Sequence, residues 1–205
     1  MEGKVAIVTG AGSRGPGIGN GKAAAILLAQ EGANVVLVDS VMSRAEETLS
    51  IIKSEHGNAI AIEADVTSAK DCERIVANTM DRYGRLDILD NNVGTSSRGT
   101  VVTFSETDWD AIIAINLKSM ILTSKYAIPS MKETAAESII NISSIAGLRS
   151  HNETPYSVTK GAVIALTFSM ATDHAEDNIR VQCIATGRVY KRMVAHRILD
   201  KGRYL

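Results

Sequence analysis

Short apolar runs rich in Val and Ile alternate with helix-length amphipathic segments along the whole sequence. Six runs are expected to form strands, at residues 5–8, 35–38, 59–62, 87–89, 139–142 and 181–184. Most are apolar at successive positions, as strands covered on both faces are. The segments between them, at residues 18–30, 43–55, 68–82, 106–131 and 156–176, are expected to form helices. Thr67-Ser68 and Ser105 are expected to cap the third and fourth helices, and Gly32, Gly57 and Gly84 fall just past helices, where a left-handed residue is favoured. Repeated strand–helix–strand units predict a parallel sheet with helices on both faces.

The expected architecture is therefore a Rossmann-like, doubly wound parallel sheet with six strands in a three-layer α/β/α sandwich. The sequence contains no linker-like or low-complexity tract, so residues 1–205 are interpreted as a single domain. Residues 188–205 differ from the rest because they are basic and aromatic and contain no convincing further strand. We expect either that the chain is truncated after the sixth strand or that this tail is rebuilt.

The composition, with 45% hydrophobic and 22% charged residues and a net charge of −1, is that of an ordinary globular domain. No basic run exists to neutralise phosphates, so neither nucleic acid nor an anionic membrane is an expected partner. No apolar stretch approaches the roughly 18 residues typical of a transmembrane helix, and no signal peptide is recognised. The widely separated Cys72 and Cys183 have no His or Cys neighbours at metal-binding spacing. They indicate reduced thiols in a cytoplasmic protein and no metal site.

A glycine-rich segment, residues 10–21, connects the first expected strand to an alanine-rich helix. Residues 10–15 spell G-x-G-x-x-G, although six glycines in one segment make that match weak by itself. The context favours a dinucleotide site, since glycines let a pyrophosphate approach the free N–H groups of a helix N-terminus. A turn that merely connects the two elements is the alternative. Pro16 cannot lie inside a helix, so the helix is expected to begin near Gly17.

Asp39 ends the second expected strand, twenty positions after Gly19. A carboxylate there can accept both hydroxyls of an adenosine ribose, and it repels a 2′-phosphate. Arg14 in the glycine loop argues in the opposite direction, because it can pair with such a phosphate. Asp39 carries more weight, so NAD is favoured over NADP as the cofactor.

Tyr156 and Lys160 are four residues apart and therefore share one face of an expected helix. A phenol is a poor base at neutral pH, and a nearby cation favours its charged form. An ordinary surface pair on an amphipathic helix is the alternative. However, the glycine loop, Asp39, the turn at residues 91–94 and Ser144 all follow strands, and the carboxyl ends of parallel strands share one edge. That edge can hold a dinucleotide and a hydroxyl beside the Tyr–Lys pair.

Taken together, these motifs resemble the classical short-chain dehydrogenase/reductase family over essentially the whole chain. The matching features are Thr9-Gly10…Gly17-Ile18-Gly19, Asn91-Asn92-Val93-Gly94, Asn116, Ser144 and Tyr156-x-x-x-Lys160. The resemblance implies that Tyr156 is the general acid/base and that Lys160 lowers its pKa and holds the nicotinamide ribose. It also implies that Ser144, rather than Ser143, hydrogen-bonds the reacting oxygen, and that Asn116 orders a water for proton relay.

The same resemblance implies a set of cofactor contacts, with Asp65 and Val66 against the adenine and Asn91 bracing the sheet instead. The implied cofactor-binding residues are Gly10, Gly12, Ser13, Gly17, Ile18, Gly19, Asp39, Asp65, Val66, Asn92, Val93, Gly94, Tyr156, Lys160, Gly187 and Val189.

Three features depart from the family pattern. The glycine loop is three residues longer, and Asp90 stands where an aliphatic residue is usual. After the sixth strand, Thr186 replaces a proline and Lys191 replaces the threonine that meets the nicotinamide amide. This last change leaves the placement of the nicotinamide open.

The expected function is an oxidoreductase that transfers a hydride between NAD(H) and a secondary alcohol or ketone. A dinucleotide-binding protein with little catalysis and an NADP-dependent reductase are the alternatives. A Ser–His hydrolase fits poorly, because no G-x-S-x-G elbow is present. The long helices bearing Asn116 and Tyr156 predict a homodimer or homotetramer.

Overall fold

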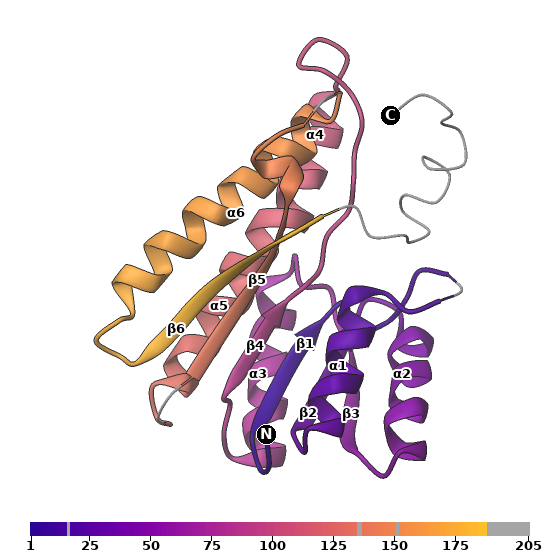
Figure 1. The fold of residues 1–205 in the computed structure, drawn as a ribbon, viewed down its shortest axis with the longest axis vertical. Coiled ribbons are helices and arrows are strands. Elements are labelled where there is room, and N and C mark those ends of the chain that lie inside the picture. The colour runs from indigo at the N-terminus through magenta and orange to yellow at the C-terminus, as the bar shows by residue number, and fades with distance from the viewer. Residues whose placement is uncertain (16, 135–136, 151, 188–205) are drawn as a thin grey trace.

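The computed structural model describes residues 1–15, 17–134, 137–150 and 152–187, which form a six-stranded parallel sheet flanked by helices (Figure 1). The strand order is β3-β2-β1-β4-β5-β6, with every neighbouring pair parallel. The strands are β1 (Val5–Thr9), β2 (Asn34–Asp39), β3 (Asn58–Glu63), β4 (Ile88–Asn91), β5 (Glu137–Ser144) and β6 (Ile179–Thr186). The doubly wound, Rossmann-like fold is confirmed. The order reverses between β1 and β4, where such sheets open a crevice at their carboxyl edge.

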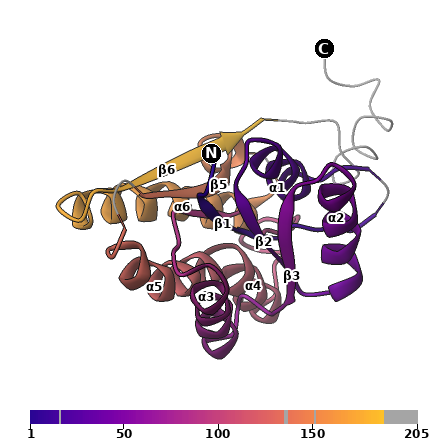
Figure 2. The ribbon, with the colours of Figure 1, turned by 90° about the horizontal axis from the view of Figure 1, so that it is seen from below.

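Helices cover both faces of the sheet, as Figure 2 shows end-on. One face carries α1 (Asn20–Gln30) and α2 (Met42–Ser54). The other face carries α3 (Ala69–Tyr83), α4 (Glu106–Ile113), α5 (Ser119–Met131) and α6 (Thr154–Asp173). Alternate residues of one strand serve the two cores: Val8 packs with the α1 and α2 side, and Ile7 with the α3 to α6 side. This explains why the strands are apolar at successive positions.

The long helical segment Glu106–Met131 is continuous but contains a π-helical turn, η1 (Ala114–Lys118), between α4 and α5. By length and composition alone this segment is apolar enough to cross a membrane, contrary to the expectation that no stretch was. About 44% of its most apolar window is buried inside the fold, and the core helix of a globular protein passes the same test. The π turn places Asn116 at the centre of the segment, fully buried.

Local signals at the helix ends were mostly correct. The hydroxyls of Ser68 and Ser105 accept hydrogen bonds from the backbone N–H groups three residues later, as the predicted caps require. Gly84 adopts the predicted positive φ after α3, but after α2 His56 takes the left-handed conformation instead of Gly57. Helix α1 begins at Asn20 rather than near Gly17, since Gly17 has a φ of 99° and Gly19 is an extended N-cap.

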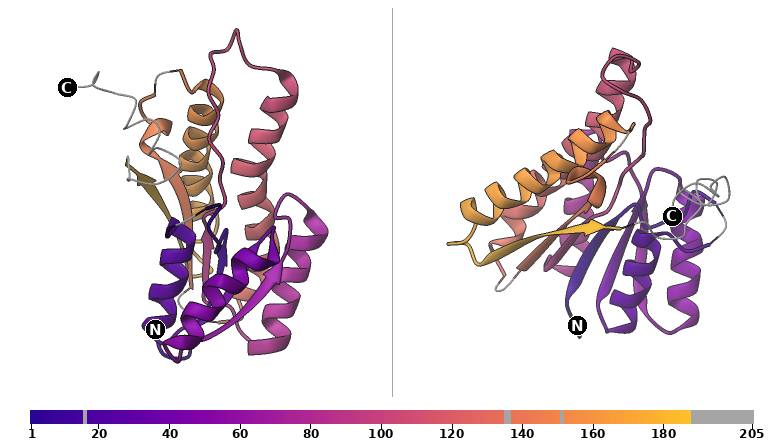
Figure 3. Two further views of the ribbon diagram at one scale, coloured as in Figure 1. Left: turned by 90° about the vertical axis from the view of Figure 1, so that its right-hand side faces the viewer. Right: turned by 45° about the horizontal axis from the view of Figure 1, so that its top comes forward.

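The connection from β4 to α4 rises beyond the carboxyl ends of the strands, beside the start of α6 (Figure 3). An isolated parallel bridge joins Gly99 of this connection to Glu153. The Gly99 N–H donates to the Asn152 carbonyl at 3.1 Å, and the Thr154 N–H donates to the Gly99 carbonyl at 3.0 Å. The two loops that overhang this edge are therefore joined through their backbones.

Candidate active site

The glycine loop is held against the end of β4 by Thr9. Its hydroxyl donates to the Asp90 carbonyl at 3.1 Å and accepts from the Asn92 N–H at 3.0 Å. A Cβ at Gly21 would overlap the Gly10 carbonyl and the Asn92 amide. Gly21 is thus required by close packing, a role that its place in a glycine-rich segment did not reveal.

The loop also closes on itself. The Gly19 N–H donates to the Ser13 hydroxyl at 2.9 Å, so Ser13 braces the turn that precedes α1. Ile18 is largely exposed at the tip. These residues lie at the N-terminus of α1, where backbone N–H groups favour an anion.

Asp39 faces the glycine loop from the end of β2. Its carboxylate accepts hydrogen bonds from the N–H groups of Gly12 and Val41, each at 3.1 Å. The guanidinium of Arg44, on the first turn of α2, lies 3.9 Å from the same carboxylate. A Cβ on Gly12 would come within 2.8 Å of Asp39 and closer still to Arg44, so only glycine fits. Sequence reasoning missed Arg44.

Helix α2 supports the loop at a second point. The buried hydroxyl of Thr48 donates to the Ala11 carbonyl at 2.8 Å. At the end of β3, Val66 is buried while Asp65 is exposed and accepts from the Thr67 N–H and hydroxyl. The Ala64 N–H donates to the Asp39 carbonyl at 3.0 Å, which places the end of β3 beside Asp39.

Tyr156 and Lys160 share one face of α6. The Lys160 ammonium lies 5.9 Å from the centre of the Tyr156 ring and donates to the Ile142 carbonyl at 2.7 Å. Only 3% of Lys160 is exposed, and this burial lowers the pKa of its ammonium to about 8. A Cβ on Gly94 would lie 3.2 Å from the ammonium nitrogen. The predicted Tyr–Lys pair and the turn after β4 therefore meet.

The two serines at the end of β5 differ in their surroundings. Ser143 is buried and its hydroxyl donates to the Lys160 carbonyl at 2.7 Å. Ser144 accepts from the Ala146 N–H at 3.2 Å, and its hydroxyl is 3.5 Å from the Thr186 carbonyl. Ser143 thus joins β5 to α6, whereas Ser144 ends the strand at the edge.

The Asn116 side chain is fully engaged in hydrogen bonds. Its Oδ1 accepts from the Thr95 N–H at 2.8 Å, and its Nδ2 donates to the Thr95 carbonyl at 2.9 Å and to the Thr159 hydroxyl at 3.1 Å. Asn91, at the end of β4, instead forms side-chain hydrogen bonds with Thr123, Ser124 and Asn141 in the buried centre of the sheet. The interpretation that Asn91 braces the sheet is confirmed.

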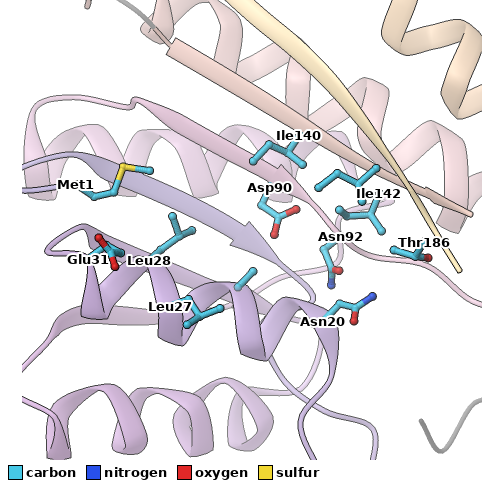
Figure 4. A pocket seen from close by; sticks show the side chains of 12 residues that line it. Met1, Asn20, Leu27, Leu28, Glu31, Asp90, Asn92, Ile140, Ile142 and Thr186 are labelled. Atoms are coloured by element: carbon cyan, nitrogen blue, oxygen red, sulfur yellow. The ribbon is translucent and has the colours of Figure 1, made fainter. Parts of the chain in front are cut away.

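A pocket of about 380 Å³ lies between α1 and the face of β4, β5 and β6 (Figure 4). Its walls are largely aliphatic, with Asn20, Asn92 and Thr186 at one end. Asp90 also lines it, and burial raises the pKa of this carboxyl to about 7. Among the described residues none donates a hydrogen bond to Asp90 Oδ1. The pocket adjoins the glycine loop on the α1 side of the sheet, and neither Tyr156 nor Lys160 lines it.

Part of the predicted site falls in the C-terminal segment. Val189 and the tail 188–205 lie outside the described residues, as does Lys191. Gly187 is the last described residue and follows Thr186, whose hydroxyl donates to the Ser143 carbonyl at 3.2 Å.

The geometry of this site is typical of one class of protein. A glycine loop, an acidic residue at the end of β2 and a buried lysine beside a tyrosine share the carboxyl edge of a doubly wound sheet, the position where such folds bind nucleotides. The family model described as short chain dehydrogenase matches residues 4–201. The chain belongs to this family and is an oxidoreductase of the short-chain dehydrogenase type.

Individual relatives agree with this assignment. An uncharacterised oxidoreductase of Thermotoga maritima is 43% identical over 188 residues, covering 91% of this chain and 72% of the relative. A 3-oxoacyl-[acyl-carrier-protein] reductase of the same organism is 33% identical over 99% of this chain and 80% of its own length. The crystal structure of a short-chain dehydrogenase/reductase from Burkholderia xenovorans superposes with a TM-score of 0.92 at 37% identity, covering 98% of this chain and 78% of that one.

Proposed function

We propose that this protein is an NAD(H)-linked oxidoreductase that interconverts a secondary alcohol and a ketone, with Tyr156 as general acid/base. The observation that carries the proposal is the Tyr156–Lys160 pair, whose ammonium is buried 5.9 Å from the phenol ring at the sheet edge that also bears the glycine loop. The described residues fit a dinucleotide, because no atom lies within 4 Å of a Cβ built on Gly17, just before α1, and the Asp39 carboxylate faces the same loop. The nicotinamide, when bound, supplies or accepts the hydride.

In this proposal the Tyr156 phenol gives a proton to the ketone oxygen or takes one from the alcohol. The nearby Lys160 ammonium favours the charged form of the phenol, which otherwise ionises near pH 10. Ser144 orients the reacting oxygen, while Ser143 holds β5 against α6 through the Lys160 carbonyl. Because the Asn116 amide is committed to Thr95 and Thr159, any water for the proton relay would be ordered by the main chain of the π-helical turn.

The preference for NAD rests on Asp39. Its carboxylate is held toward the loop by the Gly12 N–H, and a carboxylate at the end of this strand can accept ribose hydroxyls and repel a 2′-phosphate. The other proposed cofactor contacts are the ones that the family resemblance implies, and those in the loop cluster at the N-terminus of α1. An NADP-dependent reductase is the second candidate, because Arg44 lies 3.9 Å from Asp39 and can pair with a phosphate once that carboxylate is neutralised.

A protein that binds the dinucleotide with little turnover is a third candidate. It is favoured by Thr186 and Lys191, which depart from the pattern of the family. We further propose a homodimer or homotetramer, since Ile121 on α5 and Val158 and Phe168 on α6 are exposed apolar residues. The free Cys72 and Cys183 suit a reducing compartment such as the cytoplasm.

The test is NADH formation with a panel of secondary alcohols, together with the reverse reaction on the matching ketones. Tyr156→Phe should abolish turnover and leave NADH binding largely intact, whereas Tyr126→Phe on α5 should leave both unchanged. Full turnover by Tyr156→Phe would refute the mechanism. NADH binding without turnover by the wild-type protein across the whole panel would favour the third candidate.

A further inference from the structure

Thr159 lies between Tyr156 and Lys160 in sequence and is 99% buried. Its hydroxyl donates to the Tyr156 carbonyl at 2.9 Å and accepts from Asn116 Nδ2 at 3.1 Å. A threonine hydroxyl has one proton to donate, and Thr159 donates it within α6. The hydroxyl oxygen is then the acceptor of the hydrogen bond from the Asn116 amide. Thr159 is therefore bonded to the turn that carries the phenol and to the π-helical turn η1 at once.

Asn116 extends this connection to a third segment. Its remaining amide proton and its carbonyl oxygen bond the backbone of Thr95, the residue after Gly94. Gly94 in turn lies against the Lys160 ammonium, with 3.2 Å between a built Cβ and the nitrogen. The loop after β4, the turn η1 and the helix α6 are thus joined through two side chains, and Thr159 supplies the only side-chain hydrogen bond recorded between Asn116 and α6 among the described residues.

We infer that Thr159 is a positioning residue, which sets the Tyr156–Lys160 pair in register with Asn116 and the loop after β4. This inference rests on the proposed function. Without the hydroxyl, one Asn116 amide proton would be buried without a partner, a state that proteins relieve by movement. The freed movement would act on η1 and α6, the two elements whose spacing determines how the phenol meets the substrate oxygen. A displacement on the order of 1 Å is enough to reduce a rate by up to about a hundredfold.

The same helix contains a matched control in Thr167, two turns further along. Thr167 is 96% buried, donates to the Val163 carbonyl at 2.8 Å and accepts from Asn141 Nδ2 at 3.1 Å. Asn141 in turn accepts a hydrogen bond from Asn91 in the centre of the sheet, and not from the loops at the carboxyl edge. Removing either hydroxyl deprives a buried asparagine amide of one acceptor, but only Thr159 bonds Asn116, which also bonds the loop after β4.

The experiment compares Thr159→Val, Thr159→Ser and Thr167→Val with the wild-type protein. Each is measured for unfolding in urea, NADH affinity, and kcat and KM on the best alcohol of the panel as a function of pH. We expect both valine variants to lose similar stability, and only Thr159→Val to lose about tenfold in kcat, with NADH affinity unchanged. Thr159→Ser retains the hydroxyl and should restore kcat to within about twofold of wild type. Thr159→Ala repeats the comparison with a smaller side chain if valine prevents folding.

A second measurement does not require turnover. Phenolate absorbance, recorded against the matching Tyr156→Phe protein, reports the ionisation of Tyr156 alone. Loss of the Thr159 hydroxyl should move this titration upward by about one pH unit, because the cation is held less closely to the phenol. Thr167→Val should not move it.

Equal effects of Thr159→Val and Thr167→Val on kcat and on the phenolate titration would overturn the inference and leave the proposed function intact. Absence of turnover in the wild-type protein would instead refute the proposed function, and the phenolate titration would still decide the role of Thr159.

Discussion

Gly147 lies so close to Lys160 that a Cβ on the glycine would be 2.6 Å from the Lys160 carbonyl carbon and 2.8 Å from its oxygen. Real Cβ atoms do not tolerate such separations, so this glycine is required by the contact between the loop after β5 and the helix α6. The Ser157 hydroxyl, which donates to the Ala146 carbonyl at 2.6 Å, ties the same two segments together.

Gly147→Ala is therefore expected to destabilise the fold by about 1–3 kcal/mol, the usual cost of overpacking. Urea unfolding measures the loss, and turnover should fall with it because the displaced helix carries Lys160. Gly161→Ala on the facing helix is the control, since its Cβ would lie 3.3 Å from the Gly147 carbonyl oxygen. If the two alanine variants were equally stable, close packing would not be the reason for Gly147.

Lys160→Met tests the buried ammonium. Burial lowers the pKa of Lys160 from 10.5 to about 8, so between these values the unfolded chain binds a proton that the folded chain has lost. The free energy of unfolding of the wild-type protein should rise with pH across this window, because the cost of the buried charge disappears. Lys160→Met should be more stable by about 2 kcal/mol at pH 7, with no advantage near pH 10.5, and should lack turnover.

Urea unfolding at both pH values measures this difference. Lys125→Met, which removes an exposed lysine from α5, should show no such dependence on pH. A Lys160→Met protein less stable than wild type by the same amount at both pH values would contradict the assignment.

Asp90→Leu tests the buried carboxyl beside the pocket. Burial raises the pKa of Asp90 from 3.8 to about 7, so between these values the folded chain binds a proton that the unfolded chain releases. Stability is therefore lost as pH rises through this window, and the penalty is complete above pH 7. Asp90→Leu should gain about 2–4 kcal/mol over wild type at pH 8 and little at pH 4.

Asp87 provides a control of opposite sign. Burial tends to raise the pKa of this carboxyl, but hydrogen bonds from Arg85, Lys4 and the Val5 N–H outweigh burial and lower it to about 2. Asp87→Asn should consequently lose stability at pH 8, with a smaller loss as pH falls below 4. Equal gains for Asp90→Leu at pH 4 and pH 8 would show that folding does not raise the pKa of Asp90.

Asp39→Ser tests the cofactor preference. Removing the carboxylate leaves Arg44 and Arg14 without a competing negative charge, so kcat/KM should rise for NADP and fall for NAD, each by about tenfold. The ratio of the two values measures the switch. Adding Arg44→Ala to Asp39→Ser should remove the gain for NADP, and a single variant that still prefers NAD would exclude Asp39 as the discriminating residue.

Much of the fold follows from periodicity in the sequence, because most strands are apolar at successive positions and some helices have local end signals. Ser68 and Ser105 cap α3 and α4 as predicted. His56 shows the limit of such reasoning, since it adopts the left-handed conformation that Gly57 was expected to take. Histidine is one of the residues that adopt the left-handed conformation more readily than most others. The path of the chain from α2 into β3 can therefore place His56, and not Gly57, in this conformation.

The sequence predicted which residues would gather at the candidate site, but not the contacts that hold them there. Strand order brings Gly10, Asp39, Ser144 and Tyr156 to one edge, which the repeating pattern already implied. Arg44 and Thr48 were missed because their roles depend on how α2 packs against the glycine loop, a contact that no spacing in the sequence encodes. The same holds for Thr159, whose partner Asn116 is 43 residues away.

The backbone bridge between Gly99 and Glu153 limits how substrate recognition can diverge in this protein. Loops beside a reaction centre are usually exchangeable modules, but this one is fastened to the residues that begin α6 three positions before Tyr156. A change that adapts the loop to a new substrate will shift the phenol as well. Under the proposed function, substrate affinity and turnover rate are therefore coupled. Directed evolution of one will have to select for the other as well.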